Sequence, residues 1–228
     1  MASVLTQMPY SLFDQGASMK FQHYLFDLDG TLTDPGLGIK NSIRYALRTF
    51  GLPELPDQTL NAFIGPPLLD SFCRYCSVSR EDSQELLRLY REYFSDRGIF
   101  ENTVYDGIDA LLAELCRRGA SVYLATSKPE PFAIRILEHF NLIRYFTFVG
   151  GSTMDESRTE KADVIAYVMQ NAKIPAESAV MVGDRTYDIL GGKANSLATV
   201  GVLFGYGNRD ELADADHLIS SPEELLFI

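Results

Sequence analysis

The sequence predicts an α/β protein with a central parallel β-sheet and a helical insertion after the first strand. From residue 105 onward, short apolar runs alternate with amphipathic segments, a pattern typical of β-α units that feed a parallel sheet. One further apolar run lies alone near the start, and the stretch between it and residue 105 has helical periodicity without a strand pattern. With 228 residues, 46% of them apolar, the chain is large enough to bury such a core.

The predicted strands are the six apolar runs, namely His23–Phe26, Ser121–Ala125, Phe146–Val149, Ala179–Val182, Ala198–Leu203 and His217–Ile219. The insertion contains three predicted helices, Leu37–Phe50, Leu60–Tyr75 and Glu81–Phe94. Pro53 and Pro56 separate the first helix from the second.

These elements divide the chain into two parts. We expect residues 19–36 and 101–228 to form the α/β core, with residues 37–100 inserted as a helical unit. Residues 1–18 contain no Lys or Arg, and their apolar residues are scattered. We therefore interpret them as a flexible leader rather than a signal peptide, with Met19 as the functional start.

The composition limits the possible partners. The formal net charge is −11 and no basic stripe is present, which argues against nucleic acid as a partner. No apolar run approaches the roughly 18 residues that a membrane span requires. The same negative charge would repel a phosphate ester, so a phosphate site here needs local positive charge from a metal ion, a lysine and aligned backbone N–H groups.

Cysteine usage indicates a reducing compartment. Three cysteines are an odd number in a chain long enough not to need disulfides, and we expect a cytoplasmic location. Cys73 and Cys76 form a C-x-x-C pair, but the histidines are distant in sequence. Partly buried helix residues are the favoured interpretation, and a metal or redox site is the alternative. The sequence leaves the oligomeric state open.

The first strand leads directly into Asp27-Leu28-Asp29-Gly30-Thr31. Because alternate residues of an extended chain point to the same side, the two carboxylates are expected to face one way. Paired carboxylates are unusual as packing residues, since each needs a counterion. Asp29-Gly30 alone could be a simple turn.

A second segment carries hydroxyl groups at the end of the Ser121–Ala125 run. Thr126 and Ser127 precede a helix opened by Pro129, where hydroxyls and free N–H groups can bind an anion. Helix N-capping by either hydroxyl is the alternative.

Two further segments add a lysine and two carboxylates. Lys161 begins the predicted helix Lys161–Asn171, where its charge opposes the helix dipole, although a solvated lysine is also possible. Asp184 and Asp188 follow the most apolar run, and carboxylate oxygens are the ligands that Mg²⁺ prefers. Ligands of open parallel sheets bind at the carboxyl ends of the strands, so we expect all four segments to form one site.

In order, residue type and strand context, the four segments resemble the motifs of the haloacid dehalogenase superfamily. The resemblance covers residues 19–228. It implies a Rossmann-like three-layer α/β sandwich in which residues 37–100 are a mobile cap. Asp29–Leu32 and Phe63–Leu68 are similar to the phosphoglycolate phosphatase and 5′-nucleotidase-like branch. The Gly-Pro-Pro within Phe63–Leu68 is either a cap loop that reaches the site or an ordinary helix break.

The resemblance also implies roles for the individual residues. Asp27 would be the nucleophile and Asp29 the general acid and base. Mg²⁺ would be held by Asp27, the carbonyl of Asp29 and Asp184, with Asp188 close by. The transferred phosphoryl group would be held by Thr126, Ser127 and Lys161.

The activity implied is Mg²⁺-dependent hydrolysis of a small phosphomonoester, either phosphoglycolate or a nucleoside monophosphate, through an aspartyl-phosphate. Splitting hydrolysis at a covalent intermediate replaces one difficult step by two easier ones. A phosphomutase of sugar phosphates and a binding protein on a catalytically retired scaffold are the alternatives.

Overall fold

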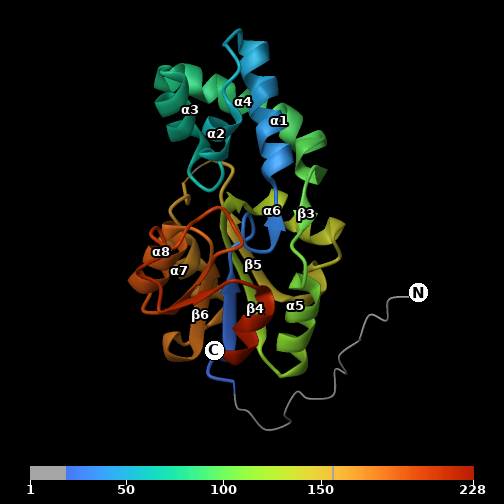
Figure 1. Cartoon of the computed structure of the whole chain (residues 1–228), viewed down its shortest axis with the longest axis vertical. Helices are drawn as coiled ribbons and strands as arrows, with labels where there is room; N and C mark the ends of the chain where they lie inside the picture. Colours follow the sequence, from blue (N-terminus) through green and yellow to red (C-terminus); the bar gives the residue numbers. More distant parts are fainter. Residues whose placement is uncertain (1–18, 156) are drawn as a thin grey trace, which may run out of the picture.

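A computed structural model describes residues 19–155 and 157–228, so the expected leader, residues 1–18, lies outside the described residues. The main sheet has six strands in the order β5-β4-β1-β6-β7-β8, and every neighbouring pair is parallel (Figure 1). Their bounds are β1 His23–Phe26, β4 Ser121–Pro129, β5 Phe146–Ser152, β6 Ala179–Gly183, β7 Ala198–Val202 and β8 His217–Ile219. The predicted α/β class with a central parallel sheet is confirmed.

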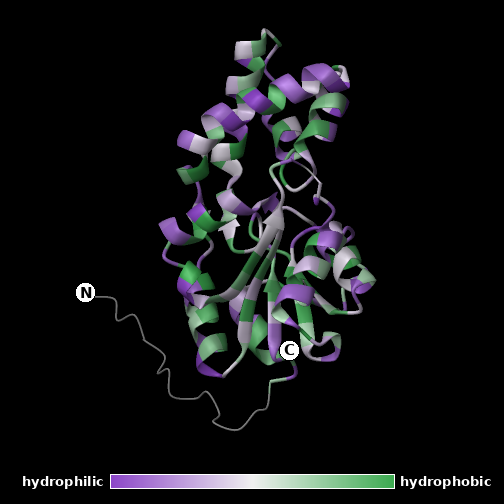
Figure 2. Ribbon diagram, turned by 180° about the vertical axis from the view of Figure 1, so that it is seen from behind, coloured by the Kyte–Doolittle hydropathy of each residue, from purple (hydrophilic) through white to green (hydrophobic). Residues whose placement is uncertain are grey.

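Helices cover both faces of this sheet, which gives three layers. Tyr24 and Phe26 in β1 point into one apolar cluster and Leu25 into the other, as the alternation of side chains along a strand requires. Helices α5 (Ile108–Arg117) and α6 (Glu130–His139) pack on the first face, and α7 (Lys161–Ala172) packs on the second, with α8 (Thr186–Ala194) beside it. Figure 2 shows hydrophobic residues gathered in the sheet between these layers.

The position of β1 determines where a site can form. The chain places β4 on one side of β1 and β6 on the other, so the strand order reverses at β1. In open α/β sheets the crevice at such a switch point, beyond the carboxyl ends of the strands, is where ligands bind. Residues that follow β1, β4 and β6 are therefore brought to one edge.

Beyond that edge stands a helical lobe, which we define as α1 to α4 (Figure 1). Its helices are α1 Gly36–Phe50, α2 Asp57–Asn61, α3 Leu68–Cys76 and α4 Arg80–Asp96. Among the described residues, no helix combines the length and the apolar character needed to cross a membrane.

The single predicted helix Leu60–Tyr75 is wrong, because the structure divides this stretch between α2 and α3. The loop Ile64–Pro67 separates them, and we call it the lobe loop. Gly65 has a φ of 102°, in the left-handed region, and Pro66 and Pro67 have no N–H to continue a helix. Apolar periodicity runs through the break, which is why the pattern read as one helix.

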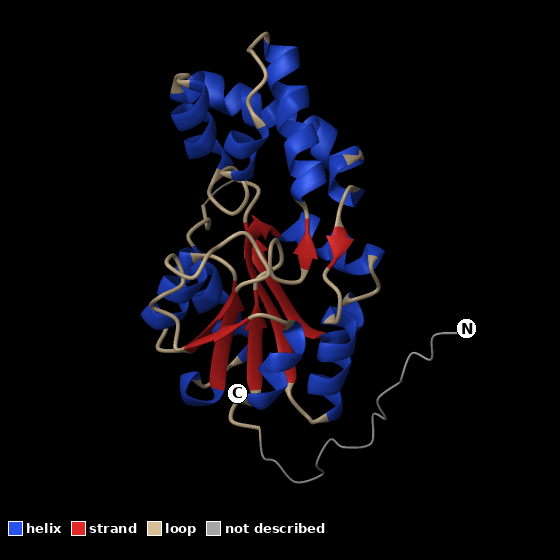
Figure 3. Ribbon diagram, in the orientation of Figure 1, coloured by secondary structure: helices blue, strands red, loops and turns tan. Residues whose placement is uncertain are grey.

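The chain enters and leaves the lobe through a two-stranded sheet that the sequence pattern did not reveal. Strands β2 (Thr33–Asp34) and β3 (Thr103–Val104) pair antiparallel, with Thr33 opposite Val104 (Figure 3). The two connections between lobe and core therefore lie side by side.

Candidate active site

Asp27 and Asp29 lie in a tight loop directly after β1. Gly30 has a φ of 85°, and its N–H donates to the carbonyl oxygen of Thr33 at 2.7 Å. The carbonyl oxygen of Leu28 accepts from the N–H of Thr33 at 3.0 Å. A side chain at position 30 would be strained in this conformation, so the glycine permits the turn that follows the two carboxylates.

Lys161 lies beside Asp27, at the first residue of α7. Its Nζ is 2.7 Å from Oδ1 of Asp27 and 2.8 Å from Oδ1 of Asp188, and it donates to the carbonyl oxygen of Ala125 at 3.1 Å. Burial alone would lower the pKa of Lys161, but the two carboxylates outweigh it and raise the pKa. The unfavourable position at a helix N-terminus is thus compensated by two charge partners.

Asp27, Asp184 and Asp188 form what we call the acid cluster: one carboxylate oxygen from each lies within 4.8 Å of the others. All three are buried. Burial, together with the carboxylates of Asp188 and Asp27, raises the pKa of Asp184 to about 8. Burial also raises the pKa of Asp188 to about 6, although Lys161 opposes the shift.

The residues around the acid cluster leave room for this crowding. A Cβ on Gly30 would lie 2.2 Å from Oδ2 of Asp184, and one on Gly183 would lie 2.2 Å from Cγ of Asp188. Oδ2 of Asp184 accepts from the N–H of Tyr206 at 2.8 Å. Buried oxygens that repel one another at this spacing are a donor set suited to a hard divalent cation, so the residues fit Mg²⁺.

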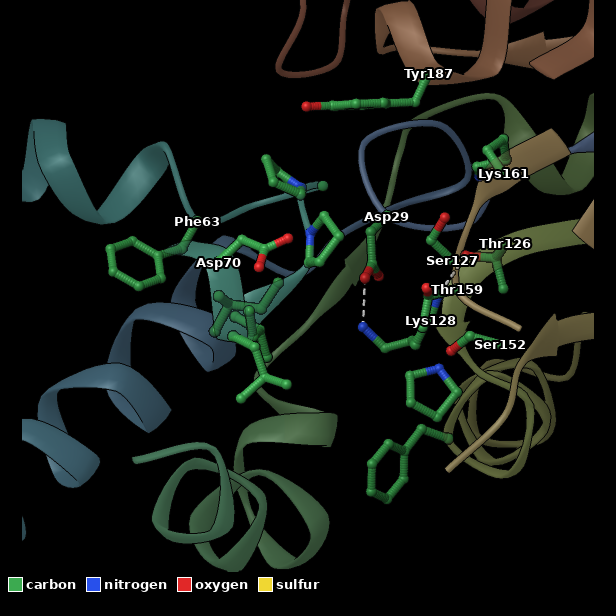
Figure 4. A pocket seen from close by; sticks show the side chains of 18 of the residues that line it. Asp29, Phe63, Asp70, Thr126, Ser127, Lys128, Ser152, Thr159, Lys161 and Tyr187 are labelled. Carbon is green, nitrogen blue, oxygen red and sulfur yellow. Dashed lines mark hydrogen bonds and ion pairs between the residues drawn. The ribbon is translucent and has the colours of Figure 1, made fainter. Parts of the chain in front are cut away.

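Asp29 has a partner that the sequence analysis did not assign. Its Oδ2 forms an ion pair with Nζ of Lys128, drawn as a dashed line in Figure 4. Burial raises the pKa of Asp29, while Lys128 opposes the shift. The same Nζ lies 4.8 Å from the ring centroid of Phe94 in α4. The two-residue spacing between Thr126 and Lys128 was the available signal, because alternate residues of an extended strand share a side.

Thr126 and Ser127 belong to the end of β4 and do not cap the following helix. Thr126 is buried, and its Oγ1 accepts from the N–H of Lys128 at 3.2 Å. Helix α6 begins at Glu130 after Pro129, without a side-chain cap. The N-cap alternative is therefore wrong, and both hydroxyl residues line the pocket described next.

A pocket of about 330 Å³ lies between the core and the lobe. Six of the seven residues singled out in the sequence line it, namely Asp27, Asp29, Thr126, Ser127, Lys161 and Asp188. Asp184, the seventh, is fully buried and does not line the pocket. Of the residues labelled in Figure 4, Phe63 and Asp70 come from the lobe, and Tyr187 of the core points into the pocket from another side.

The lobe loop both breaks the helix and reaches the pocket. Gly65, Pro66 and Pro67 line the pocket, so the two interpretations of the Gly-Pro-Pro segment hold together. Cys73 and Cys76 are free, partly buried residues of α3, and neither lines the pocket. Sequence reasoning missed Phe63, Arg185 and Tyr187 as individual lining residues, because their positions depend on how the lobe sits on the core.

The model of the haloacid dehalogenase-like hydrolases matches residues 24–202, a stretch that contains all seven residues. The chain belongs to this family. The resemblance inferred from the sequence is confirmed.

Three similar proteins with known names or solved structures cover most of this chain. A 5′-nucleotidase of Pseudomonas aeruginosa is 42% identical over 86% of this chain and 89% of its own length. A crystal structure of a predicted phosphatase from Clostridium acetobutylicum is 42% identical, with a TM-score of 0.87 over 92% of this chain and 98% of that one. The tyrosine-protein kinase PtkA of Mycobacterium tuberculosis is 40% identical over 83% of this chain, which spans only 64% of that protein.

Proposed function

We propose that the chain is a Mg²⁺-dependent phosphatase of small phosphomonoesters, with a nucleoside monophosphate as the favoured substrate. The observation that carries this proposal is the carboxylate of Asp27, which lines the pocket beside the ammonium group of Lys161 and belongs to the acid cluster. An ionised carboxylate held beside positive charge is suited to attack phosphorus. The resemblance to a 5′-nucleotidase and to a phosphatase structure supports the reaction class.

Asp27 and Asp29 divide the chemistry between nucleophile and proton carrier. Attack by a carboxylate oxygen of Asp27 on phosphorus forms an aspartyl-phosphate and breaks the bond to the leaving alcohol. Water then attacks the phosphorus of this intermediate, which releases inorganic phosphate and restores the Asp27 carboxylate. Asp29 donates a proton to the leaving oxygen and later removes one from that water. Its burial raises its pKa, which favours the protonated form needed for the first step.

The negative charge on the transferred phosphoryl group is met by Lys161 and by the hydroxyls of Thr126 and Ser127. Mg²⁺ held by Asp27, the carbonyl of Asp29 and Asp184 would supply further positive charge where the phosphoryl oxygens lie. Asp188, which is paired with Lys161, would complete the surroundings of the metal. The buried, mutually repelling carboxylates support this assignment.

The helical lobe serves in this proposal as a cap, which we take as residues 37–100, on the core formed by residues 19–36 and 101–228. Closed over the pocket, it excludes water and contacts the leaving group. The pocket of about 330 Å³ has the aromatic side chain of Tyr187 in its wall, with 44% of that residue exposed. A nucleoside would use this apolar surface, whereas the two-carbon glycolate group would leave most of it unfilled. The free thiols suit a reducing compartment, and we place the protein in the cytoplasm.

Phosphate release tests the proposal directly. The purified protein, with Mg²⁺ added, is assayed against nucleoside monophosphates, phosphoglycolate and sugar phosphates, with a chelator-treated sample in parallel. Release from a nucleoside monophosphate that stops on chelation is the expected result. Interconversion of sugar phosphates with little release would point to a phosphomutase. A lack of turnover on every ester, with intact phosphate binding, would indicate a retired scaffold.

A further inference from the structure

The lobe loop, Ile64–Pro67, forms part of the pocket wall through Gly65, Pro66 and Pro67. Its prolines carry no N–H, so they offer no backbone donor to a neighbour. Among residues 19–155 and 157–228, one core side chain forms a hydrogen bond with this loop. That side chain is Arg185, whose Nη1 donates to the carbonyl oxygen of Ile64.

Arg185 connects this wall to the acid cluster. It follows Asp184 directly, and its backbone N–H donates to Oδ2 of Asp188 at 3.0 Å. Its Nε donates to Oε1 of Glu211 at 2.8 Å, and Glu211 also accepts from the N–H of Thr186 at 3.1 Å. The guanidinium group is therefore fixed at one edge by an anchored carboxylate, while its other edge holds the lobe loop. A planar group with several fixed donors can serve two acceptors at once.

Gly65 allows the guanidinium to approach the loop this closely. A Cβ on Gly65 would lie 2.9 Å from Nη1 and 3.3 Å from Cγ of Arg185. Any larger residue at position 65 would push the arginine away from the carbonyl of Ile64, in addition to the strain of its φ of 102°. The absence of a side chain at Gly65 therefore makes the space that the Arg185 guanidinium occupies.

We propose that Arg185 is a positioning residue for leaving-group selection: by holding Ile64 it fixes the lobe loop as a wall of the closed pocket. This inference rests on the proposed phosphatase function, in which the lobe contacts the leaving group. Loss of the contact lets the lobe loop move. A substrate whose leaving group fills the pocket should then lose more binding affinity than a substrate whose leaving group is too small to reach the loop.

Two substrates and Arg185→Gln test the proposal. The best nucleoside monophosphate is compared with acetyl phosphate, whose leaving group is only acetate. The variant should raise the KM of the nucleotide about tenfold more than that of acetyl phosphate, as expected when one charged hydrogen bond that orders a binding wall is lost. Arg185→Lys, which can reach only one acceptor at a time, should fall between. An equal loss of kcat on both substrates, with unchanged KM values, would overturn the proposal, because it would place the effect at the acid cluster.

Glycine substitutions provide the matched control from the lobe side. Gly51 is also a lobe glycine in the left-handed region, with a φ of 89°, but a Cβ there would meet nothing within 4 Å. Gly65→Ala should reproduce the KM effect of Arg185→Gln, and Gly51→Ala should leave both substrates unaffected. Combining Gly65→Ala with Arg185→Gln should add little to either change alone, since both break one contact. Full additivity would count against a shared contact.

Hydrogen exchange gives a measurement that does not depend on activity. In Arg185→Gln the amides of residues 63–71 should exchange about tenfold faster than in the unaltered protein, while those of β1 stay unchanged. If exchange becomes faster but the unaltered protein hydrolyses no ester, the contact between Arg185 and the lobe loop is supported and the proposed phosphatase function is rejected. Unchanged exchange in that segment would reject the positioning role of Arg185.

Discussion

Replacing Asp184 with asparagine is expected to stabilise the metal-free protein, even though Asp184 is a proposed Mg²⁺ ligand. The pKa of this carboxyl rises from an ordinary 3.8 to about 8 in the folded protein. The unfolded chain therefore ionises Asp184 readily while the folded one resists, so stability is lost as pH rises from about 4 to 8. At about 1.4 kcal/mol per pKa unit, the penalty is on the order of a few kcal/mol at pH 7 and clearly smaller at pH 5.

Asparagine removes this penalty and keeps an oxygen that can accept from the N–H of Tyr206. Denaturant unfolding of both proteins in chelator, at pH 5 and pH 7, measures the difference. Added Mg²⁺ should stabilise the unaltered protein and have far less effect on Asp184→Asn. Asp96, whose side chain is 82% exposed, gives a matched control, and Asp96→Asn should shift stability by no more than about 0.5 kcal/mol. If Asp184→Asn is no more stable than the unaltered protein at pH 7 without metal, the electrostatic reasoning is refuted.

Three other predictions concern catalysis. Asp27→Ala should abolish turnover, whereas Asp29→Ala should slow it about 10²–10⁴-fold. With an activated aryl phosphate that carries labelled phosphate, quenched-flow measurement should detect a labelled aspartyl-phosphate that accumulates on Asp29→Ala. Label on Asp27→Ala would place the nucleophile elsewhere. Lys128→Met removes the charge that opposes the raised pKa of Asp29, so the alkaline limb of the kcat/KM profile should move to higher pH; an unmoved limb would mean that Asp29 is not the acid that limits it. Deleting residues 37–100 should leave a folded core with a much lower kcat/KM on the best small ester, and equal activity of the capless core would contradict the specificity role of the lobe.

Much of the core and the convergence of the candidate site could be predicted from the sequence because both follow from one rule. Strands that run parallel bring their carboxyl ends to one edge, so Asp27, Thr126 and Asp184 had to meet if the apolar runs were strands. Lys161 could be added because a lysine at a helix N-terminus needs a compensating partner, and the structure supplies two. The catalytic roles of these residues stay predictions.

The contacts between lobe and core could not be predicted in the same way. The contact of the Lys128 Nζ with the Phe94 ring and the hydrogen bond from Arg185 to Ile64 join residues far apart in sequence, and neither leaves a periodic pattern. The break at the lobe loop was hidden because apolar spacing continues across it. Local glycine and proline chemistry, rather than periodicity, decided the structure at Gly65.

The pairing of Thr33 with Val104 has a consequence for how such a protein can change over generations. Because the chain enters and leaves the lobe at adjacent, paired residues, lengthening or exchanging the inserted segment leaves the register of the six-stranded sheet unchanged. Descendants can therefore acquire new surfaces on the lobe while inheriting the candidate site residues of the core unaltered. Grafting a foreign insert between these two positions is accordingly a route for redesign that should leave the fold of the six-stranded core unchanged.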